Sequence, residues 1–192
     1  WRKQDPGAVG VDKAKLDEAI AFAIAHENPE TKDLAVAIPN QFRGEAPYNT
    51  LIGPTQPRAG SNGLVIRRGS LIGEWGDTTR ADMTFSVTKT FLSTVVGIAF
   101  DRGQIKNVTD RVAMYMPKGV DLFTAPHNAP MTWEHLLRQR SDWSGTLWGK
   151  PDWADRPPRN QPPAQWQDRE LHDPGTFYKY NDTRINVLAP SP

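Results

Sequence analysis

The sequence predicts an α/β fold of the α+β sandwich type, in which helices pack on an antiparallel sheet beside a helical subdomain. Residues 63–75 contain two short strands, LVIR and LIGEW, around a turn at Arg68-Gly69-Ser70. Residues 86–102 are apolar nearly all round and stop before Gly103, which is the pattern of a buried helix. With 192 residues, 38% of them apolar, the chain is long enough for one domain with its own core.

The residues before the hairpin contain a further helix and an irregular stretch. Residues 12–27 have apolar side chains near the helical period, and Asp12 is placed to cap the first turn. Residues 34–38 form a short apolar run that Pro39 stops, and we expect residues 41–62 to be an irregular excursion before the sheet resumes. The apolar positions of the predicted helix are Leu16, Ile20, Phe22, Ala23 and Ile24.

The second half of the chain combines short helical pieces with one long loop. Residues 107–116 form a short piece that ends at Pro117, and Thr132 can cap a helix over 133–138. The stretch 143–174 holds four tryptophans and six prolines without periodicity, so we expect a long ordered loop.

The last predicted element is a short helix near the end of the chain. Either Asn181 or Asp182 could cap it, and it carries Ile185, Val187 and Leu188.

The composition excludes several classes of function. The 23 basic and 22 acidic residues are spread along the chain and give a net charge of +1, so no basic stripe is available for nucleic acid or an anionic membrane. The longest strongly apolar stretch, 90–100, is far shorter than the roughly 20 residues that cross a bilayer. The N-terminus has no apolar signal core, which leaves a cytoplasmic protein or a secreted or periplasmic one whose signal has been removed.

We expect no metal and no cofactor. The absence of cysteine excludes disulfides and thiolate metal sites, and it fits a reducing or an oxidising compartment equally well. Residues 145–151, GTLWGKP, are one residue short of a phosphate-binding loop and have a proline where the loop needs a hydroxyl group. The histidines lack carboxylate partners at helical spacing, and we interpret them as surface or packing residues; they are His26, His127, His135 and His172.

Ser86 and Lys89 carry the pattern of a serine nucleophile with an activating lysine. Three residues apart at the start of a helix, their side chains lie on one face within reach of each other. A lysine among apolar groups loses stability in its charged form, so its pKa falls and the neutral amine can accept the serine proton. The Ser86 amide at the helix N-terminus could help to hold an oxyanion. The alternative is that Ser86 caps the helix and Lys89 is solvated, but a following TFLSTVVGIAF is unusual for a solvated surface.

Three segments resemble a known family. FSVTKTFLSTVVGIAFDRGQI followed by NVTDRVAMYMP resembles the nucleophile helix of class C β-lactamases, their esterase relatives and D-amino-acid peptidases, which are penicillin-recognising serine hydrolases. MTWEHLLRQRSDWSG resembles the helix that precedes a Ser-Gly in that family, with Asp142 and Trp143 replacing the usual glycine and its neighbour. PGTFYKYNDTRINVLA resembles the Pro-Gly turn that leads to the family's Tyr-x-Asn motif.

The resemblance implies a β-lactamase/transpeptidase-like fold and assigns roles to residues of the third motif. Tyr180 takes the place of the tyrosine that works with the lysine as general base and returns the proton to the leaving group. Asp182 stands where the family has asparagine, with Asn181 before it, and both are candidate substrate-binding residues. An ionised Asp182 would disfavour acidic substrates, which favours esters or amides over true carboxylated β-lactams. Trp148 is the candidate from the loop for lining the acyl pocket.

The resemblance also implies a missing part. The family's last motif, Lys-Thr-Gly or His-x-Gly on a central strand, is absent, and two or three strands of the expected sheet are absent with it. We therefore interpret residues 1–192 as the N-terminal part of a catalytic domain, with a first helix and strands over 1–85 and a mainly helical region over 86–192. A fragment, or a second chain or segment that completes the sheet, would explain the exposed sheet edge.

The predicted function is acyl transfer through a covalent serine intermediate, on an ester, amide or β-lactam carbonyl of a small molecule. One alternative is a penicillin-binding-like sensor that is acylated but does not release the acyl group. Another is an inactive homologue. Ser141-Asp142-Trp143 could instead be the Ser-Asp-Asn element of class A enzymes, but Trp143 breaks that pattern.

Overall fold

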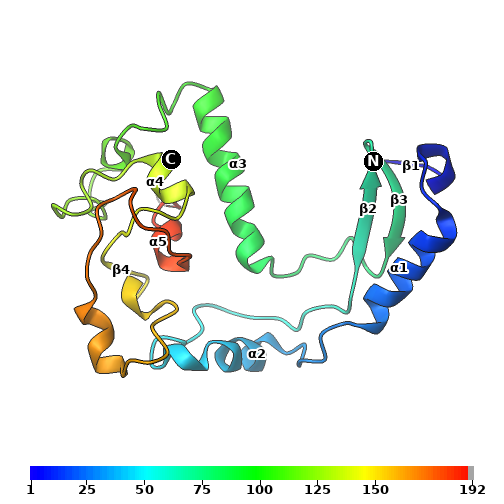
Figure 1. The fold of residues 1–192 in the computed structure, drawn as a ribbon, viewed down its shortest axis with the longest axis horizontal. Helices are drawn as coiled ribbons and strands as arrows, with labels where there is room; N and C mark the ends of the chain where they lie inside the picture. Colours follow the sequence, from blue (N-terminus) through cyan, green and yellow to red (C-terminus); the bar gives the residue numbers. More distant parts are fainter. Residues whose placement is uncertain (190–192) are drawn as a thin grey trace. The chain divides into compact units, whose positions relative to one another are not determined.

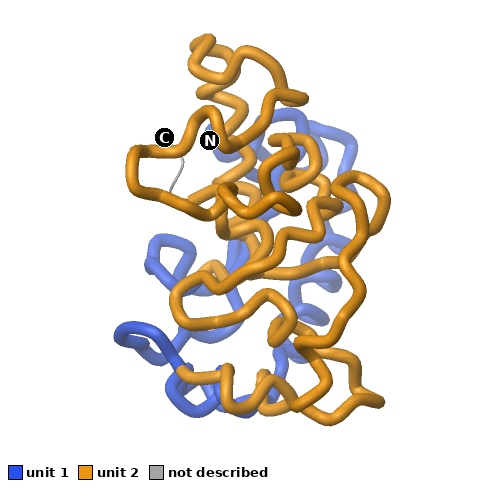
Figure 2. Tube along the Cα trace, turned by 90° about the vertical axis from the view of Figure 1, so that its left-hand side faces the viewer, with its two compact units in different colours: residues 1–41, 51–83 blue, residues 42–50, 84–192 orange. Residues whose placement is uncertain are grey.

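The computed structural model describes residues 1–189 and has an α+β fold. The chain divides into two compact units. Unit 1 comprises Trp1–Gln41 and Leu51–Met83, and unit 2 comprises Phe42–Thr50 and the chain from Thr84 onward (Figure 1, Figure 2). None of the helices among residues 1–189 is long and apolar enough to cross a membrane.

Unit 1 contains a three-stranded sheet with the order β1-β3-β2. The predicted hairpin is present as β2 (Gly63–Arg67) and β3 (Ser70–Trp75), which pair antiparallel, while β1 (Arg2–Lys3) pairs with β3 in parallel. The two residues of the hairpin loop, Arg68 and Gly69, have φ values of 49° and 77°. Positive φ at both central residues gives a turn whose twist matches that of the flanking strands. The sheet is therefore mixed, where the sequence predicts an antiparallel one.

Helix α1 (Lys13–Ala25) packs on the sheet of unit 1 (Figure 1). Asp12 caps it as predicted, because its carboxylate accepts the amides of Ala14 and Lys15. A Cβ built on Gly73 of β3 would lie 3.2 Å from a methyl carbon of Ile20, so the helix approaches the strand closely at this glycine. Leu16, Ile20 and Ala23 on the helix are half-buried. The other two predicted apolar positions, Phe22 and Ile24, are exposed to solvent instead.

The apolar run after Thr31 is a helix, which corrects the expectation that Pro39 stops it. Helix α2 (Leu34–Gln41) contains Pro39, and its first turn is closed by Asp33, whose carboxylate accepts the amide of Ala35. The backbone carbonyl of Asp33 accepts the amides of Val36 and Ala37. An aspartate at this position supplies the acceptors that the free amides at the start of a helix require. The helix therefore forms although it contains Pro39.

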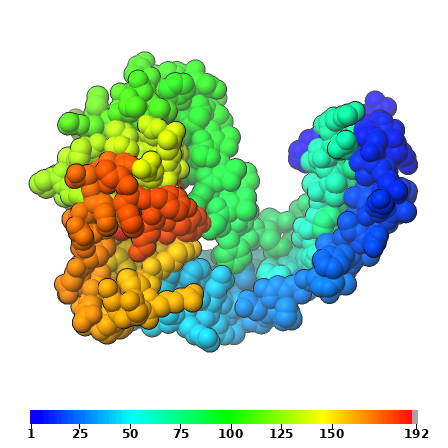
Figure 3. All heavy atoms as spheres, viewed as in Figure 1, coloured from blue at the N-terminus to red at the C-terminus, as the bar shows by residue number. Residues whose placement is uncertain are grey.

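Unit 2 is built around one apolar core. Its helices are α3 (Thr88–Asp101), α4 (Trp133–Leu137) and α5 (Asp182–Asn186), and its only strands among the described residues are the short pair β4 (Thr146–Leu147) and β5 (Lys150–Pro151). In the space-filling view, the red atoms around α5 lie against the yellow-green atoms around α4 (Figure 3). The core consists of Val96, Ala99, Ile105, Val112, Phe123, Met131, Trp133, Leu136, Trp143, Leu147, Ile185, Val187 and Leu188.

Two predicted caps in unit 2 are confirmed. Thr132 accepts the amide of His135 and so begins α4, and its own amide is bonded to the His135 ring. Of the two candidates for the last helix, Asn181 is the cap, since its side chain accepts the amide of Arg184 at 2.8 Å. The piece predicted over 107–116 is a 3-10 turn at Val112–Tyr115.

Helix α3 differs from its prediction as a fully buried helix. Only Val96 and Ala99 are buried in the core of unit 2. The side facing away from that core is also apolar, but Phe91 and Val95 are 61% and 53% exposed. The helix therefore contacts the core of its unit along one stripe rather than all round.

The stretch 143–174 is not a loop without elements, because it contains the β4–β5 pair and 3-10 turns at Asp152–Ala154 and Pro163–Asp168. A group of buried ion pairs holds this stretch against α5. The guanidinium group of Arg184, on α5, contacts Asp142 at 2.5 Å and Asp152 at 3.0 Å. Arg169 contacts the same two carboxylates at 2.9 Å each. Both aspartates are almost completely buried, so two positive and two negative charges compensate one another in a largely buried cluster.

The substitution Asp142→Asn should destabilise the protein strongly. Burial raises the pKa of Asp142, but the His172 amide and the charges of Arg184 and Arg169 outweigh it and leave the pKa lowered. Removing this charge leaves two buried guanidinium groups undercompensated, so urea denaturation should show a loss of about 3–5 kcal/mol. Asparagine tolerates the positive φ of 50° at this position, so backbone strain does not contribute.

The exposed Asp121 provides the matched control, because its substitution by asparagine should cost less than about 0.5 kcal/mol. A carboxylate with a lowered folded pKa stabilises the protein above its unfolded pKa of about 3.9. This contribution should disappear as the pH falls through the folded pKa. Equal costs for the two substitutions at pH 7 would contradict the assigned role of Asp142.

Candidate active site

Ser86 lies at a strained turn just before α3. Ser86 is the middle residue of a 3-10 turn, Phe85–Val87, that continues directly into the helix. Ser86 is exposed to solvent. Phe85 has a φ of 46°, a value that a bulky residue rarely adopts. Such strain is found where the chain must present a side chain in a fixed direction, and here it immediately precedes the predicted nucleophile.

The structure brings the three predicted catalytic side chains together. The Oγ atom of Ser86 accepts a hydrogen bond from the Lys89 ammonium at 3.2 Å and from the Tyr180 hydroxyl at 2.8 Å. Lys89 comes from the first turn of α3, whereas Tyr180 comes from the segment just before α5, 94 residues further along the chain than Ser86. A serine hydroxyl with two titratable partners within hydrogen-bonding distance is the arrangement that nucleophilic catalysis requires.

Asp182 changes the expected state of Lys89. Its carboxylate forms an ion pair with the Lys89 ammonium. Burial favours the neutral amine, as the sequence analysis expects, but hydrogen bonding to Asp182 and Tyr180 and their charges outweigh burial and raise the pKa of Lys89. The expected fall in the pKa of Lys89 is therefore wrong, and the ammonium form dominates at neutral pH.

Arg156 is a further member of the site that the sequence did not indicate. Its guanidinium carbon lies 4.6 Å from the centre of the Tyr180 ring, and the Lys89 nitrogen lies 5.0 Å from it. The same guanidinium group donates to Asp182 at 3.0 Å and to Asp155 at 2.7 Å. Tyr180 therefore has two cations beside its ring, and the two cations share Asp182.

These charges form one chain that extends away from Ser86. The buried Asp155 contacts both Arg156 and, at 3.8 Å, Lys150, which pairs at 2.5 Å with Glu45. The members alternate in sign and number three cations and three carboxylates, namely Lys89, Asp182, Arg156, Asp155, Lys150 and Glu45.

The pKa values of Asp182 and Asp155 are shifted in opposite directions. Burial raises the pKa of Asp182, but its contacts with Lys89 and Arg156 outweigh burial and leave it lowered. Burial and the neighbouring charge of Asp182 raise the pKa of Asp155 against the effect of Arg156 and Lys150. Asp182 is therefore the ionised carboxylate that pairs with Lys89.

The two remaining candidates lie elsewhere. Asn181 is completely buried, and its amide group donates to the backbone carbonyl of Asp152 at 2.8 Å while its oxygen caps α5. Its side chain thus holds α5 rather than facing the open side of the site. Trp148 is 60% exposed in the turn between β4 and β5, and no hydrogen bond or ring contact within residues 1–189 joins it to Ser86.

The class A alternative does not fit the surroundings of Ser141 and Asp142. Ser141 is buried and accepts the amide of Trp143 two residues later. Asp142 is engaged by the arginines of the loop and α5, and Trp143 belongs to the core. In the part of the chain that the structure describes, no group of three or more histidine, aspartate or glutamate side chains is arranged to hold a metal ion.

Comparison with known proteins identifies the family of this chain. A family model described as Beta-lactamase matches residues 51–190, which include Ser86, Lys89 and Tyr180. The chain therefore belongs to the beta-lactamase family, within the serine hydrolase-like superfamily. Comparisons with curated proteins and with solved structures gave no match.

Substitution of Asp182 should lower the pKa of Lys89. In Asp182→Asn, the ammonium loses its charged partner while its burial remains, so the pKa of Lys89 should fall. Titration of ¹³C-labelled lysine side chains by NMR measures this pKa directly. Lys118, at an exposed position, is the internal control. An unchanged pKa of Lys89 would show that the ion pair does not control its protonation.

Proposed function

We propose that this protein catalyses acyl transfer to water through an ester intermediate on Ser86. The observation that carries this proposal is the contact of the Ser86 hydroxyl with both Lys89 and Tyr180 at 3.2 and 2.8 Å, at a turn that exposes the hydroxyl group. Membership of the beta-lactamase family supports the same class of chemistry.

The proton transfers follow from the charges around Tyr180. Lys89 remains an ammonium, so Tyr180 is the proton acceptor, and its phenolate form is stabilised by the adjacent ammonium and by the guanidinium of Arg156. The phenolate takes the proton of Ser86 as Oγ bonds to the substrate carbonyl carbon. The same proton then passes to the leaving group as its bond to carbon breaks.

The second half of the reaction reuses these groups. Tyr180 takes a proton from water as the water oxygen attacks the acyl carbon, and returns it to Ser86 as the ester bond breaks. The Ser86 amide, at the start of the helical segment, is the proposed donor to the oxyanion in both steps. The rate of acylation should rise with pH because the phenolate form of the Lys89–Tyr180 pair has one proton fewer.

We propose neutral esters or amides as the substrate class. The two cations beside the Tyr180 ring, Lys89 and Arg156, are already paired with Asp182 and Asp155. A substrate carboxylate would have to compete with these partly buried pairs, whereas a neutral carbonyl compound would not. Carboxylated β-lactams should therefore acylate Ser86 more slowly than a simple ester does.

Intact-mass spectrometry with peptide mapping tests the nucleophile. After brief mixing with p-nitrophenyl acetate, the protein should gain one acetyl group on the peptide that contains Ser86, and benzylpenicillin should react more slowly. The adduct should be absent in Ser86→Ala and strongly reduced in Lys89→Ala. Ser93→Ala, on an exposed position of the same helix, should be acylated like the wild type.

Three outcomes of this experiment separate the alternatives. An adduct that accumulates without turnover would identify a sensor rather than a hydrolase. No adduct on a protein shown to be folded by circular dichroism would contradict the catalytic proposal and favour an inactive homologue. Label on a residue other than Ser86 would exclude Ser86 as the nucleophile.

Tyr180→Phe should slow acylation without moving it to another residue. The substitution keeps the aromatic ring beside Lys89 and Arg156 but removes the oxygen that contacts Ser86. Loss of a general base reduces rates by about 10²–10⁴-fold. Stopped-flow measurement of p-nitrophenol release gives the rate constant. Tyr178→Phe, at an exposed neighbouring position, is the control, and equal rates in the two variants would exclude Tyr180 as the base.

A further inference from the structure

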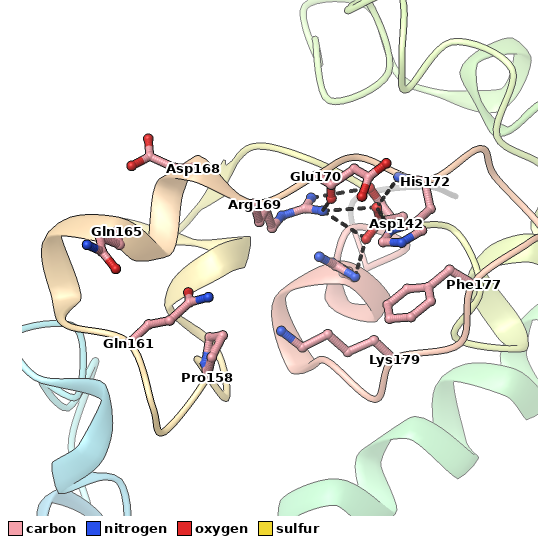
Figure 4. A pocket seen from close by; sticks show the side chains of 11 residues that line it. Asp142, Pro158, Gln161, Gln165, Asp168, Arg169, Glu170, His172, Phe177 and Lys179 are labelled. Carbon is pink, nitrogen blue, oxygen red and sulfur yellow. Dashed lines mark hydrogen bonds and ion pairs between the residues drawn. The ribbon is translucent and has the colours of Figure 1, made fainter.

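A pocket lies in unit 2, lined by the residue that directly precedes Tyr180. Its volume is about 530 Å³, within the range of small-molecule sites. Lys179, Asp142 and Phe177 belong to its wall, whereas Ser86, Lys89 and Tyr180 do not. Figure 4 shows the Lys179 side chain extending toward the space beside Gln161 and Pro158.

The wall of this pocket contains one ammonium group, that of Lys179, outside the ion pairs of the two arginines. Arg169 and Arg184 are compensated by Asp142 and Asp152, which leaves those four groups neutral as a set. Lys179 adds one cation, and within residues 1–189 its ammonium has no hydrogen bond or ion pair. The Nε atom of Arg184 is buried without a hydrogen-bond partner in the same residues. The Lys179 ammonium is therefore the cation of this wall that is left for a ligand.

The pKa of Lys179 is lowered by its surroundings. Burial, followed by the charges of Arg184 and Arg169, lowers it against the opposing charges of Asp155 and Asp152. Two carboxylates, Asp168 and Glu170, also line the pocket, but both residues are exposed, where water and salt screen their charge. Asp168 and Glu170 would repel a ligand with several negative charges more strongly than a small ligand with one negative charge beside Lys179.

The remaining wall is suited to an apolar ring. Phe177 and His172 both line the pocket, and their rings are stacked with centres 4.1 Å apart and planes 12° apart. Flat aromatic surfaces of this kind bury the apolar body of a ligand while a few polar groups fix its orientation.

We propose that this pocket binds a small monocarboxylate, with the carboxylate paired to Lys179 and the apolar body against Phe177. The site is separate from the Ser86 chemistry and does not depend on it. The segment that carries Lys179 continues into Tyr180 and the Arg184 helix, so occupancy would brace the segment that presents the catalytic tyrosine. The test therefore measures binding and not activity.

Titration with 4-fluorobenzoate, followed by ¹⁹F NMR, tests the site on the intact chain. The wild type should bind 4-fluorobenzoate at least tenfold more tightly than the neutral 4-fluorobenzamide. Lys179→Met should weaken binding of the benzoate at least tenfold, whereas Lys118→Met, at an exposed lysine, should leave it unchanged. Equal affinity for the acid and the amide, or no effect of Lys179→Met, would overturn the proposal.

Two further measurements locate the ligand and guard against misfolding. Ser86→Ala should bind the benzoate as the wild type does, and loss of binding in this variant would place the carboxylate in the catalytic site instead. If Lys179→Met does not fold, ¹³C NMR of the lysine side chains in the wild type tests the proposal instead. Saturating benzoate should raise the pKa of Lys179, and an unchanged value would overturn the proposal.

Discussion

The position of Tyr180 opposite Ser86 depends on the buried ion pairs of Arg184. This arginine lies in α5, immediately after the Tyr180 segment. It joins the helix to Asp142, just before the stretch 143–174, and to Asp152 within that stretch. Only a five-residue helix follows Tyr180, and a helix of that length has little stability of its own. The buried charges and the Asn181 cap supply the anchorage that the helix alone does not.

Paired opposite charges are also found beside Ser86, where cations and carboxylates alternate from Lys89 to Glu45. A partly buried ammonium next to Ser86 would favour its neutral form without a counterion, and Asp182 prevents this. In the proposed mechanism, Lys89 therefore holds positive charge and Tyr180 moves the proton. An asparagine at residue 182 could hydrogen bond to Lys89 but could not supply its counterion.

The sequence predicted the elements with strong local signals and missed those set by distant contacts. The Asp12, Thr132 and Asn181 caps and the hairpin at 63–75 were predictable because a few adjacent residues determine them. The buried state of α3 was not, because its composition does not say which faces meet the core of its own unit. Helix α2 was missed because Pro39 masked the signal of Asp33.

The candidate site also combines residues that the local sequence predicts with residues that only distant contacts bring together. Ser86 and Lys89 follow from their spacing, and Tyr180 from a resemblance over sixteen residues. Arg156 lies in the proline- and tryptophan-rich loop, where no periodicity or spacing indicates a partner, and only the fold brings it to Asp182 and Tyr180. The pKa of Lys89 was misjudged because burial was visible in the sequence while the ion pair with Asp182 was not.

The central claim, that Ser86 is a nucleophile activated within this charged group, is tested most directly by the first turnover with p-nitrophenyl acetate. The account predicts a burst of one equivalent of p-nitrophenol per protein chain, with a rate constant that rises with pH and an amplitude that vanishes in Ser86→Ala. A burst that persists in Ser86→Ala, or no p-nitrophenol release above the uncatalysed rate by the folded wild type, would contradict it.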